Sequence, residues 1–316
     1  MSLLKMLTKP QKLLKLTEDL LNGIPASQKP PIYLAGLPRS GTTWIGSVLN
    51  TSPGIKYCFE PFNEKLIPEA VPHRQKHLNR DDWDEEFARY CRDALGGRIN
   101  TPYIRLQLNW IYKKIPWFPG RVLVKDVNSL LVLEWLDRHI SQTIVIIMRH
   151  PCAVASSWFR LWKGPQKELE FLLNTLLKQP KLMKNYLHPF EQEIKTARGF
   201  WQKMGAFWGA MYYVALQQQN QHPKWLVVQH EQFCHNPSRA YRQLFERLDL
   251  PWSARTDDLL DASTYKNSKN PFVTRRISSQ EPDKWKQELE PWQIEEVKTF
   301  VRPFSIQDYP DLFERV

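Results

Sequence analysis

Cysteine is scarce in this sequence of 316 residues, and none of its four cysteines lies in a Cys-x-x-Cys pair. That spacing is typical of zinc and redox sites, so the sequence predicts neither a zinc site nor a disulfide framework. The four are Cys58, Cys91, Cys152 and Cys234. His73 and His77 lie four residues apart, but no third candidate ligand accompanies them. We therefore expect no bound metal.

Long apolar runs are also missing. No such run reaches 18 residues, whereas a helix that spans a bilayer needs about 20. The sequence has no signal-peptide pattern, repeat or low-complexity tract, and we expect a cytoplasmic protein without a transmembrane segment. Residues 1–28, rich in leucine and lysine, are expected to form a helical extension. A packing helix over residues 11–21 is the main interpretation, and a peripheral membrane contact is the alternative.

Acidic residues are outnumbered, with 33 Asp and Glu against 44 Lys and Arg, which gives a net charge of +11. Such a balance favours anionic partners. No arginine-rich block or nucleic-acid motif occurs, so nucleic acid is not expected. A protein that binds anionic polymers without catalysis remains one alternative. With 42% hydrophobic residues, the chain can form a sizeable core, and we expect one domain over residues 1–316.

The most informative segment begins with the apolar residues 32–36 and ends with the amphipathic residues 44–49. This pattern predicts a strand, a tight loop and the start of a helix. Backbone N–H groups of such a loop point at one position, at the positive end of a helix dipole, where phosphate or sulfate binds. The loop residues are Pro38, Arg39, Ser40, Gly41, Thr42 and Thr43.

The loop departs from the Walker A sequence, Gly-x4-Gly-Lys-Ser/Thr. Gly36 and Gly41 have the required spacing, but Thr42 occupies the lysine position, and the cation is Arg39. An NTPase needs that lysine on the β- and γ-phosphates. The loop should therefore bind anions yet cleave ATP or GTP poorly, and a nucleotide kinase or NTPase is a second alternative.

A second anion site is predicted after the β-branched residues 142–148. Arg149 follows this strand directly, and Ser157 lies eight residues later on an expected helix. Ligands of open α/β sheets bind at the carboxyl ends of strands. Strands that alternate with helices along the chain predict an α/β fold, with a central, mostly parallel sheet flanked by helices in three P-loop-like layers.

The two segments resemble the PAPS-dependent sulfotransferase family over about residues 30–300. The loop ending in Trp44 is similar to the family's 5′-phosphosulfate loop, and Arg149 with Ser157 to its 3′-phosphate site. Residues 225–233 and 236–248 are similar to a late strand and helix. Arg275 and Arg276 resemble a C-terminal loop that clasps the cofactor, although a glycine often found there is absent.

This resemblance implies PAPS as sulfo donor, PAP as product and no metal requirement. Trp44 would stack on the adenine and His230 would lie at its edge. The residues implied to bind the cofactor are Arg39, Ser40, Gly41, Thr42, Thr43, Trp44, Arg149, Ser157, His230, Arg275 and Arg276.

Sulfuryl transfer resembles phosphoryl transfer in depending on positioning and electrostatics. Arg39 and the loop amides would neutralise the leaving phosphate, and Lys125, at a predicted strand end, would reach the transferring group. A lysine occurs at that position in cytosolic members. Many of these have a histidine two residues later, where this chain has Val127. The phenol and steroid subgroup is therefore disfavoured.

Glu60 is the preferred general base. It lies 21 residues after Arg39, at the end of the next predicted strand, and carbohydrate and tyrosylprotein sulfotransferases have a glutamate at about that spacing. Asp126 and His150 remain alternatives. The resemblance implies O-sulfation of a carbohydrate, lipid or small natural product, with an amine acceptor also possible. Residues 64–119 and 160–222 should form the acceptor side, and the oligomeric state is left open.

Overall fold

The computed structural model describes residues 29–65, 67–95, 99, 101, 104, 120–140, 142–264 and 281–313. The predicted extension over residues 1–28 lies outside the described residues. So do Arg275, Arg276 and most of the interval 96–119.

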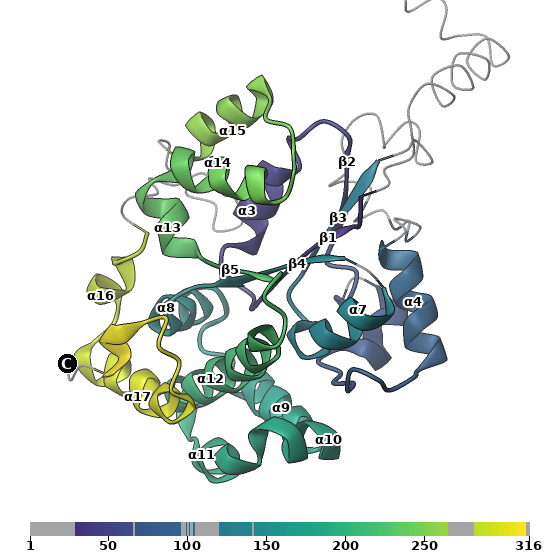
Figure 1. Ribbon diagram of the computed structural model, residues 1–316. Helices are drawn as coiled ribbons and strands as arrows, with labels where there is room; N and C mark the ends of the chain where they lie inside the picture. The colour runs from purple at the N-terminus through teal and green to yellow at the C-terminus, as the bar shows by residue number, and fades with distance from the viewer. Residues whose placement is uncertain are drawn as a thin grey trace, which may run out of the picture.

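Among the described residues, five strands form one sheet in the order β2-β3-β1-β4-β5, and every neighbouring pair is parallel (Figure 1). Their mostly apolar side chains suit strands that are buried on both faces. The strands are β1 (Ile32–Gly36), β2 (Ile55–Phe59), β3 (Arg121–Asp126), β4 (Thr143–Met148) and β5 (Leu226–Gln229).

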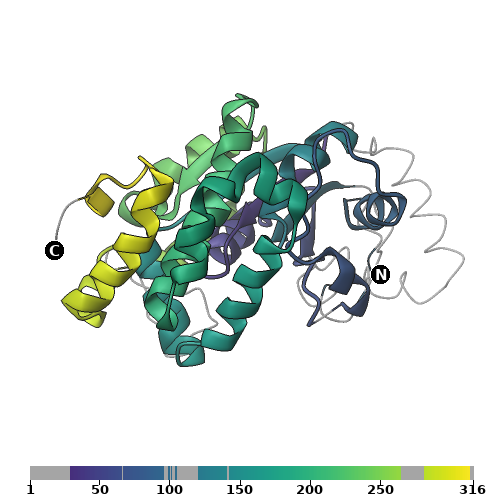
Figure 2. The same cartoon turned by 90° about the horizontal axis from the view of Figure 1, so that it is seen from below.

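Helices cover both faces of the sheet (Figure 1). On one face lie α3 (Thr42–Leu49), α13 (His230–His235), α14 (Pro237–Arg247) and α15 (Ala254–Thr264). On the other lie α4 (Glu85–Leu95), α7 (Leu133–His139), α8 (Pro151–Trp162), α9 (Gln166–Leu177), α12 (Gly199–Asn220) and α17 (Pro291–Val301). The helix α12 packs along α17 beneath the sheet (Figure 2).

Shorter helical segments complete the described chain. They are η1 (Pro68–His73), η2 (Leu130–Val132), α10 (Pro180–Leu182), η3 (Met183–Leu187), η4 (His188–Phe190), α11 (Glu191–Thr196), α16 (Lys284–Glu288), η6 (Arg302–Phe304) and η7 (Pro310–Phe313).

The two hydrophobic cores follow from the alternation of side chains along each strand. In β1, Ile32 and Leu34 belong to the core under α3, α13 and α14. Tyr33 and Ala35 belong to the larger core under α8, α9 and α12. The predicted α/β class, with a parallel sheet between two helical layers, is confirmed.

Candidate active site

The predicted anion-binding loop lies between β1 and α3 and has the left-handed backbone that a tight turn needs. Gly41, at the N-terminus of α3, has a φ of +85°, and Arg39 has a φ of +75°. A Cβ atom at Gly41 would lie 2.0 Å from Cδ2 of His230. Glycine is therefore required there both by backbone conformation and by the close approach of the histidine ring.

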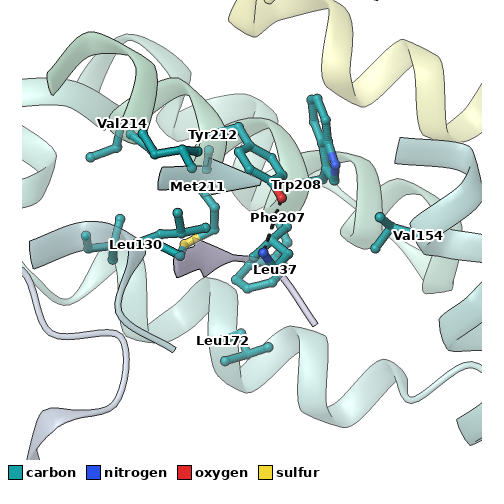
Figure 3. Close-up of a cluster of buried hydrophobic side chains, with 14 of the residues drawn as sticks. Leu37, Leu130, Val154, Leu172, Phe207, Trp208, Met211, Tyr212 and Val214 are labelled. Atoms are coloured by element: carbon teal, nitrogen blue, oxygen red, sulfur yellow. Dashed lines mark hydrogen bonds between the residues drawn. The ribbon is translucent and has the colours of Figure 1, made fainter. Parts of the chain in front are cut away.

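The loop is held from beneath by Tyr212 of α12 (Figure 3). The Tyr212 hydroxyl accepts a hydrogen bond from the Leu37 N–H at 3.2 Å and donates one to the Ile147 carbonyl at 2.8 Å. It also lies 2.9 Å from the hydroxyl of Ser40. Ser40 is thus fully buried, and its side chain joins the loop to α12 rather than lining the cavity above it.

A cavity of about 710 Å³ opens at the carboxyl ends of the strands. Such a crevice is where open α/β sheets bind ligands. It brings together most of the residues selected from the sequence, although they are up to 191 positions apart in the chain. Those that line it are Arg39, Gly41, Thr42, Thr43, Trp44, Glu60, Lys125, Arg149 and His230.

Two arginines lie side by side at the loop: Arg39 belongs to it, and Arg149 contacts it from the end of β4. The Arg149 guanidinium donates to the Arg39 carbonyl at 3.1 Å, and Arg39 Nε donates to the hydroxyl of Ser157 at 3.0 Å. Ser157, only 3% exposed, therefore lies behind Arg39 and orients it. Arg149 also faces a carboxylate of Glu281 at 3.6 Å.

The Arg149 side chain is 11% exposed, and its buried Nε has no hydrogen-bond partner among the described residues. An unsatisfied donor on a buried cation is costly unless a ligand supplies the acceptor. Because Arg149 lines the cavity beside the loop, this donor fits an anionic ligand group there.

Lys125, at the carboxyl end of β3, forms an ion pair with Glu60. Its ammonium lies 4.5 Å from the ring centre of Phe59 and is almost fully buried. Asn63 donates to the other Glu60 oxygen at 2.7 Å. Glu60 has a φ of +49°, and its N–H donates to the Lys125 carbonyl at 2.6 Å. The carboxylate and the ammonium are thus held together in the cavity wall.

The other two candidate bases are placed differently. Asp126 is fully buried and accepts hydrogen bonds from the Phe62 N–H, the Asn128 N–H and the Ser129 hydroxyl. Burial raises the pKa of its carboxyl to about 6. Because successive side chains of a strand face opposite ways, Lys125 lines the cavity and Asp126 does not.

His150 also has structural contacts. Its ring stacks on Trp285 at 4.5 Å and lies 3.1 Å from the carboxylate of Asp311, and its Nδ1 accepts from the Cys152 N–H at the start of α8. It does not line the cavity. Of the three candidate bases, Glu60 is the one that does.

His230 and Trp44 both line the cavity. Burial, reinforced by the positive charge of Arg149, holds the pKa of His230 well below its ordinary value, so its ring is neutral at pH 7. The Trp44 ring meets it edge to face at 5.9 Å, and the indole N–H donates to Ser263 at 3.0 Å. Both rings are about nine-tenths buried or more, so their cavity-facing surfaces are small and rigid.

The cavity wall also contains polar residues that no sequence motif indicated. They are Asn63, Glu64, Lys65, Arg74, Gln75 and Glu168. Some described residues of the ranges 64–119 and 160–222, among them Gln75 and Glu168, line the cavity, and the acceptor side that the sequence assigns to these ranges stays a prediction. Tryptophans and leucines of α8 and α9 form part of its apolar wall, together with Pro165 and Phe207.

The described residues contain no group of three or more His, Cys, Asp or Glu residues arranged to hold a metal ion. Within the same residues, no helix has the length and hydropathy needed to cross a bilayer.

Comparison with solved structures finds similar chain arrangements at low sequence identity. The sulfotransferase domain of an olefin synthase from Synechococcus is 15% identical, with 89% of this chain and 97% of that chain covered and a TM-score of 0.45. A sulfotransferase from Alicyclobacillus acidocaldarius is 17% identical, with coverage of 87% and 92% and a TM-score of 0.43. A mouse sulfotransferase complexed with PAP is 12% identical, with coverage of 92% and 90% and a TM-score of 0.47.

In the comparison with curated proteins, none is significantly similar to this chain. The sequence pattern of the sulfotransferase family, by contrast, matches residues 30–254, well over half of the chain and all five strands. The matched range includes the loop after β1, the arginine after β4 and the Lys125–Glu60 pair. This protein is a sulfuryl-transferring enzyme that belongs to the sulfotransferase family.

Proposed function

We propose that the enzyme transfers the sulfuryl group of PAPS to a hydroxyl group of an acceptor and releases PAP. One observation carries the proposal: a single cavity contains the loop at the α3 N-terminus, two arginines and the Lys125–Glu60 pair. The loop with Arg39 and the neighbouring Arg149 both line this cavity, which suits a donor with anionic groups at its 5′ and 3′ positions.

In this proposal the loop amides and Arg39 bind the 5′-phosphosulfate, because they lie at the positive end of the α3 dipole. Arg149 binds the 3′-phosphate through the guanidinium edge that includes its unpartnered Nε. Charge-assisted hydrogen bonds of this kind are the strong ones. Glu281, which faces Arg149, would have to move away from the incoming phosphate.

Lys125 and Glu60 then act in sequence. As the donor binds, Lys125 turns from Glu60 to the oxygens of the sulfuryl group and stabilises the charge that develops on them. Glu60, released from its ion pair, accepts the proton of the acceptor hydroxyl. The acceptor oxygen forms a bond to sulfur, the bond from sulfur to the 5′-phosphate oxygen breaks, and PAP leaves with that electron pair.

Isothermal calorimetry with PAP, followed by competition with ATP, tests the donor site. We expect PAP to bind and ATP, which lacks the 3′-phosphate, to compete poorly. Incubation with PAPS and a panel of acceptors should produce PAP and a product heavier by one sulfo group, and EDTA should not abolish turnover. Absence of PAP binding, or turnover that depends on added Mg²⁺ and ATP, would reject the proposal.

A further inference from the structure

We propose that the acceptor is a neutral, polyhydroxylated molecule, such as a sugar unit, bound by Glu64, Arg74 and Gln75. This inference rests on the proposed sulfuryl transfer and specifies its acceptor. It starts from three cavity-lining residues whose side chains each have one buried polar atom without a hydrogen-bond partner among the described residues. The three atoms are Oε2 of Glu64, Nε of Arg74 and Oε1 of Gln75.

Buried polar groups in folded proteins almost always have partners, so each exception needs an explanation. Here the exceptions are clustered, since Glu64 and Arg74 are joined by an ion pair of 2.8 Å and Gln75 follows Arg74 in the chain. Gln75 is only 2% exposed. Two of the orphan atoms accept hydrogen bonds and one donates, which is the complement that a pair of hydroxyl groups would satisfy.

The backbone holds this cluster rigidly. Gln75 has a φ of +50°, an unfavourable value for glutamine. Its N–H donates to the Asn128 carbonyl at 3.0 Å, and its carbonyl accepts from Gln179 at 2.9 Å. A strained residue that is fixed on both sides is characteristic of ligand sites. Asn128 lies three residues after Lys125, so the cluster is attached to the same strand end as the reacting groups.

The charges of the cluster balance. Arg74 pairs with both Glu64 and Glu168, and Lys65 lies 3.9 Å from Glu168. Two cations and two carboxylates leave no net charge for an anionic acceptor. Paired charges still bind hydroxyl groups well, because a hydroxyl can donate to a carboxylate and accept from a guanidinium. The cluster therefore favours a neutral polyol over an acidic glycan.

The rest of the wall is apolar, as a sugar with a nonpolar face requires. It is formed by Trp158, Leu161, Trp162, Pro165, Leu172 and Phe207. A flat phenol would use this wall but would leave the polar cluster buried without partners, at a cost in affinity. A sugar unit can pack its nonpolar face on the apolar wall and form hydrogen bonds with the polar cluster.

The wild-type test compares three acceptors with PAPS as donor: a neutral methyl glycoside series, 2-naphthol and an oligosaccharide that contains uronic acid. We expect neutral glycosides to give the highest kcat/KM. Preference for 2-naphthol or for the acidic oligosaccharide would overturn the inference while leaving sulfuryl transfer in place. Failure to bind PAP would instead reject the proposed function itself.

Variants test the residues. Gln75→Met keeps the side-chain length and removes the orphan acceptor, and Glu64→Gln keeps the shape and removes the charge. Each should lower kcat/KM for the preferred glycoside by about tenfold or more, mainly through KM. The Kd for PAP should stay near wild type, which separates an effect on the acceptor from a general loss of folding. Glu69→Gln, at an exposed position on η1, is the matched control. Unchanged KM in both variants would overturn the inference.

Discussion

At the scale of single residues, the proposed chemistry depends on a carboxylate and an ammonium that form an ion pair. Glu60 is oriented from two sides, by Lys125 and by Asn63. Its left-handed backbone directs the side chain toward the cavity immediately after β2 ends. The arrangement suggests a base that becomes available only when Lys125 has another anion to bind.

Replacement of Glu60 by glutamine should separate catalysis from donor binding. Glu60→Gln keeps the size and hydrogen bonding of the side chain but removes the proton acceptor. General-base catalysis contributes about 10²–10⁴-fold, so we expect kcat to fall by that factor while PAP affinity stays within about threefold. Asp126→Asn should affect kcat much less. Near-wild-type kcat in Glu60→Gln would show that the base lies elsewhere.

Arg149→Ala, by contrast, should lower the affinity for the sulfo donor and its product PAP. A charge-assisted hydrogen bond contributes about 1.5–3 kcal/mol, which corresponds to a loss of PAP affinity of about 10- to 150-fold. Calorimetry with PAP measures the loss. The control is Arg138→Ala, because Arg138 is half exposed on α7 and pairs only with the surface residue Asp81 among the described residues. Equal affinities in the two variants would remove Arg149 from the donor site.

At the scale of elements, the anion-binding loop depends on a helix that follows it by more than 150 residues in the chain. The long helix α12 passes under the loop and presents Tyr212 to it (Figure 3). Trp208 of the same helix donates from its indole to the Arg149 carbonyl at 3.0 Å. One helix therefore positions both proposed phosphate-binding regions.

Tyr212→Phe should destabilise the conformation of the anion-binding loop, although Tyr212 itself does not line the cavity. It removes the partner of the Leu37 N–H, which is buried, and a lost buried partner costs about 1–3 kcal/mol. We expect a lower free energy of unfolding together with weaker PAP binding. Tyr213→Phe, one position along α12, is the matched control and should change neither. Full PAP affinity in Tyr212→Phe would mean that the loop holds its shape unaided.

At the scale of the whole molecule, the free energy of unfolding should depend on the ionisation of the buried Asp126 carboxyl group. Asp126 has a pKa of about 6 against an ordinary value of 3.8. The folded protein therefore holds this proton more tightly than the unfolded chain does. The resulting stabilisation is complete below pH ~4 and is lost as the pH rises through ~6.

The measurable quantity is the difference in free energy of unfolding between the wild type and Asp126→Asn. From about pH 4 to about pH 7 the wild type should lose up to ~3 kcal/mol relative to the variant, since each pKa unit corresponds to about 1.4 kcal/mol. Denaturant titrations at several pH values give this difference. A constant difference across the range would mean that Asp126 does not titrate there.

The sequence by itself determined the layout of the site. Apolar runs defined the strands, and in a parallel sheet the carboxyl ends of all strands meet at one edge. The sequence therefore predicted that residues just after those runs lie near one another. These residues include Arg39, Glu60, Lys125 and Arg149. The loop pattern specified an anion site because the spacing of its glycines controls the local backbone geometry, although Tyr212 of α12 supports the folded loop.

Only the tertiary structure decided which way each side chain faces and what supports it. Lys125 and Asp126 are adjacent in sequence, yet one lines the cavity and the other is enclosed in the core. Ser157, selected as a ligand contact, does not line the cavity and accepts a hydrogen bond from Arg39. Tyr212 and Gln75 had no motif, because their roles depend on partners between 53 and 175 positions away. Packing between distant segments sets such roles, and no local pattern encodes it.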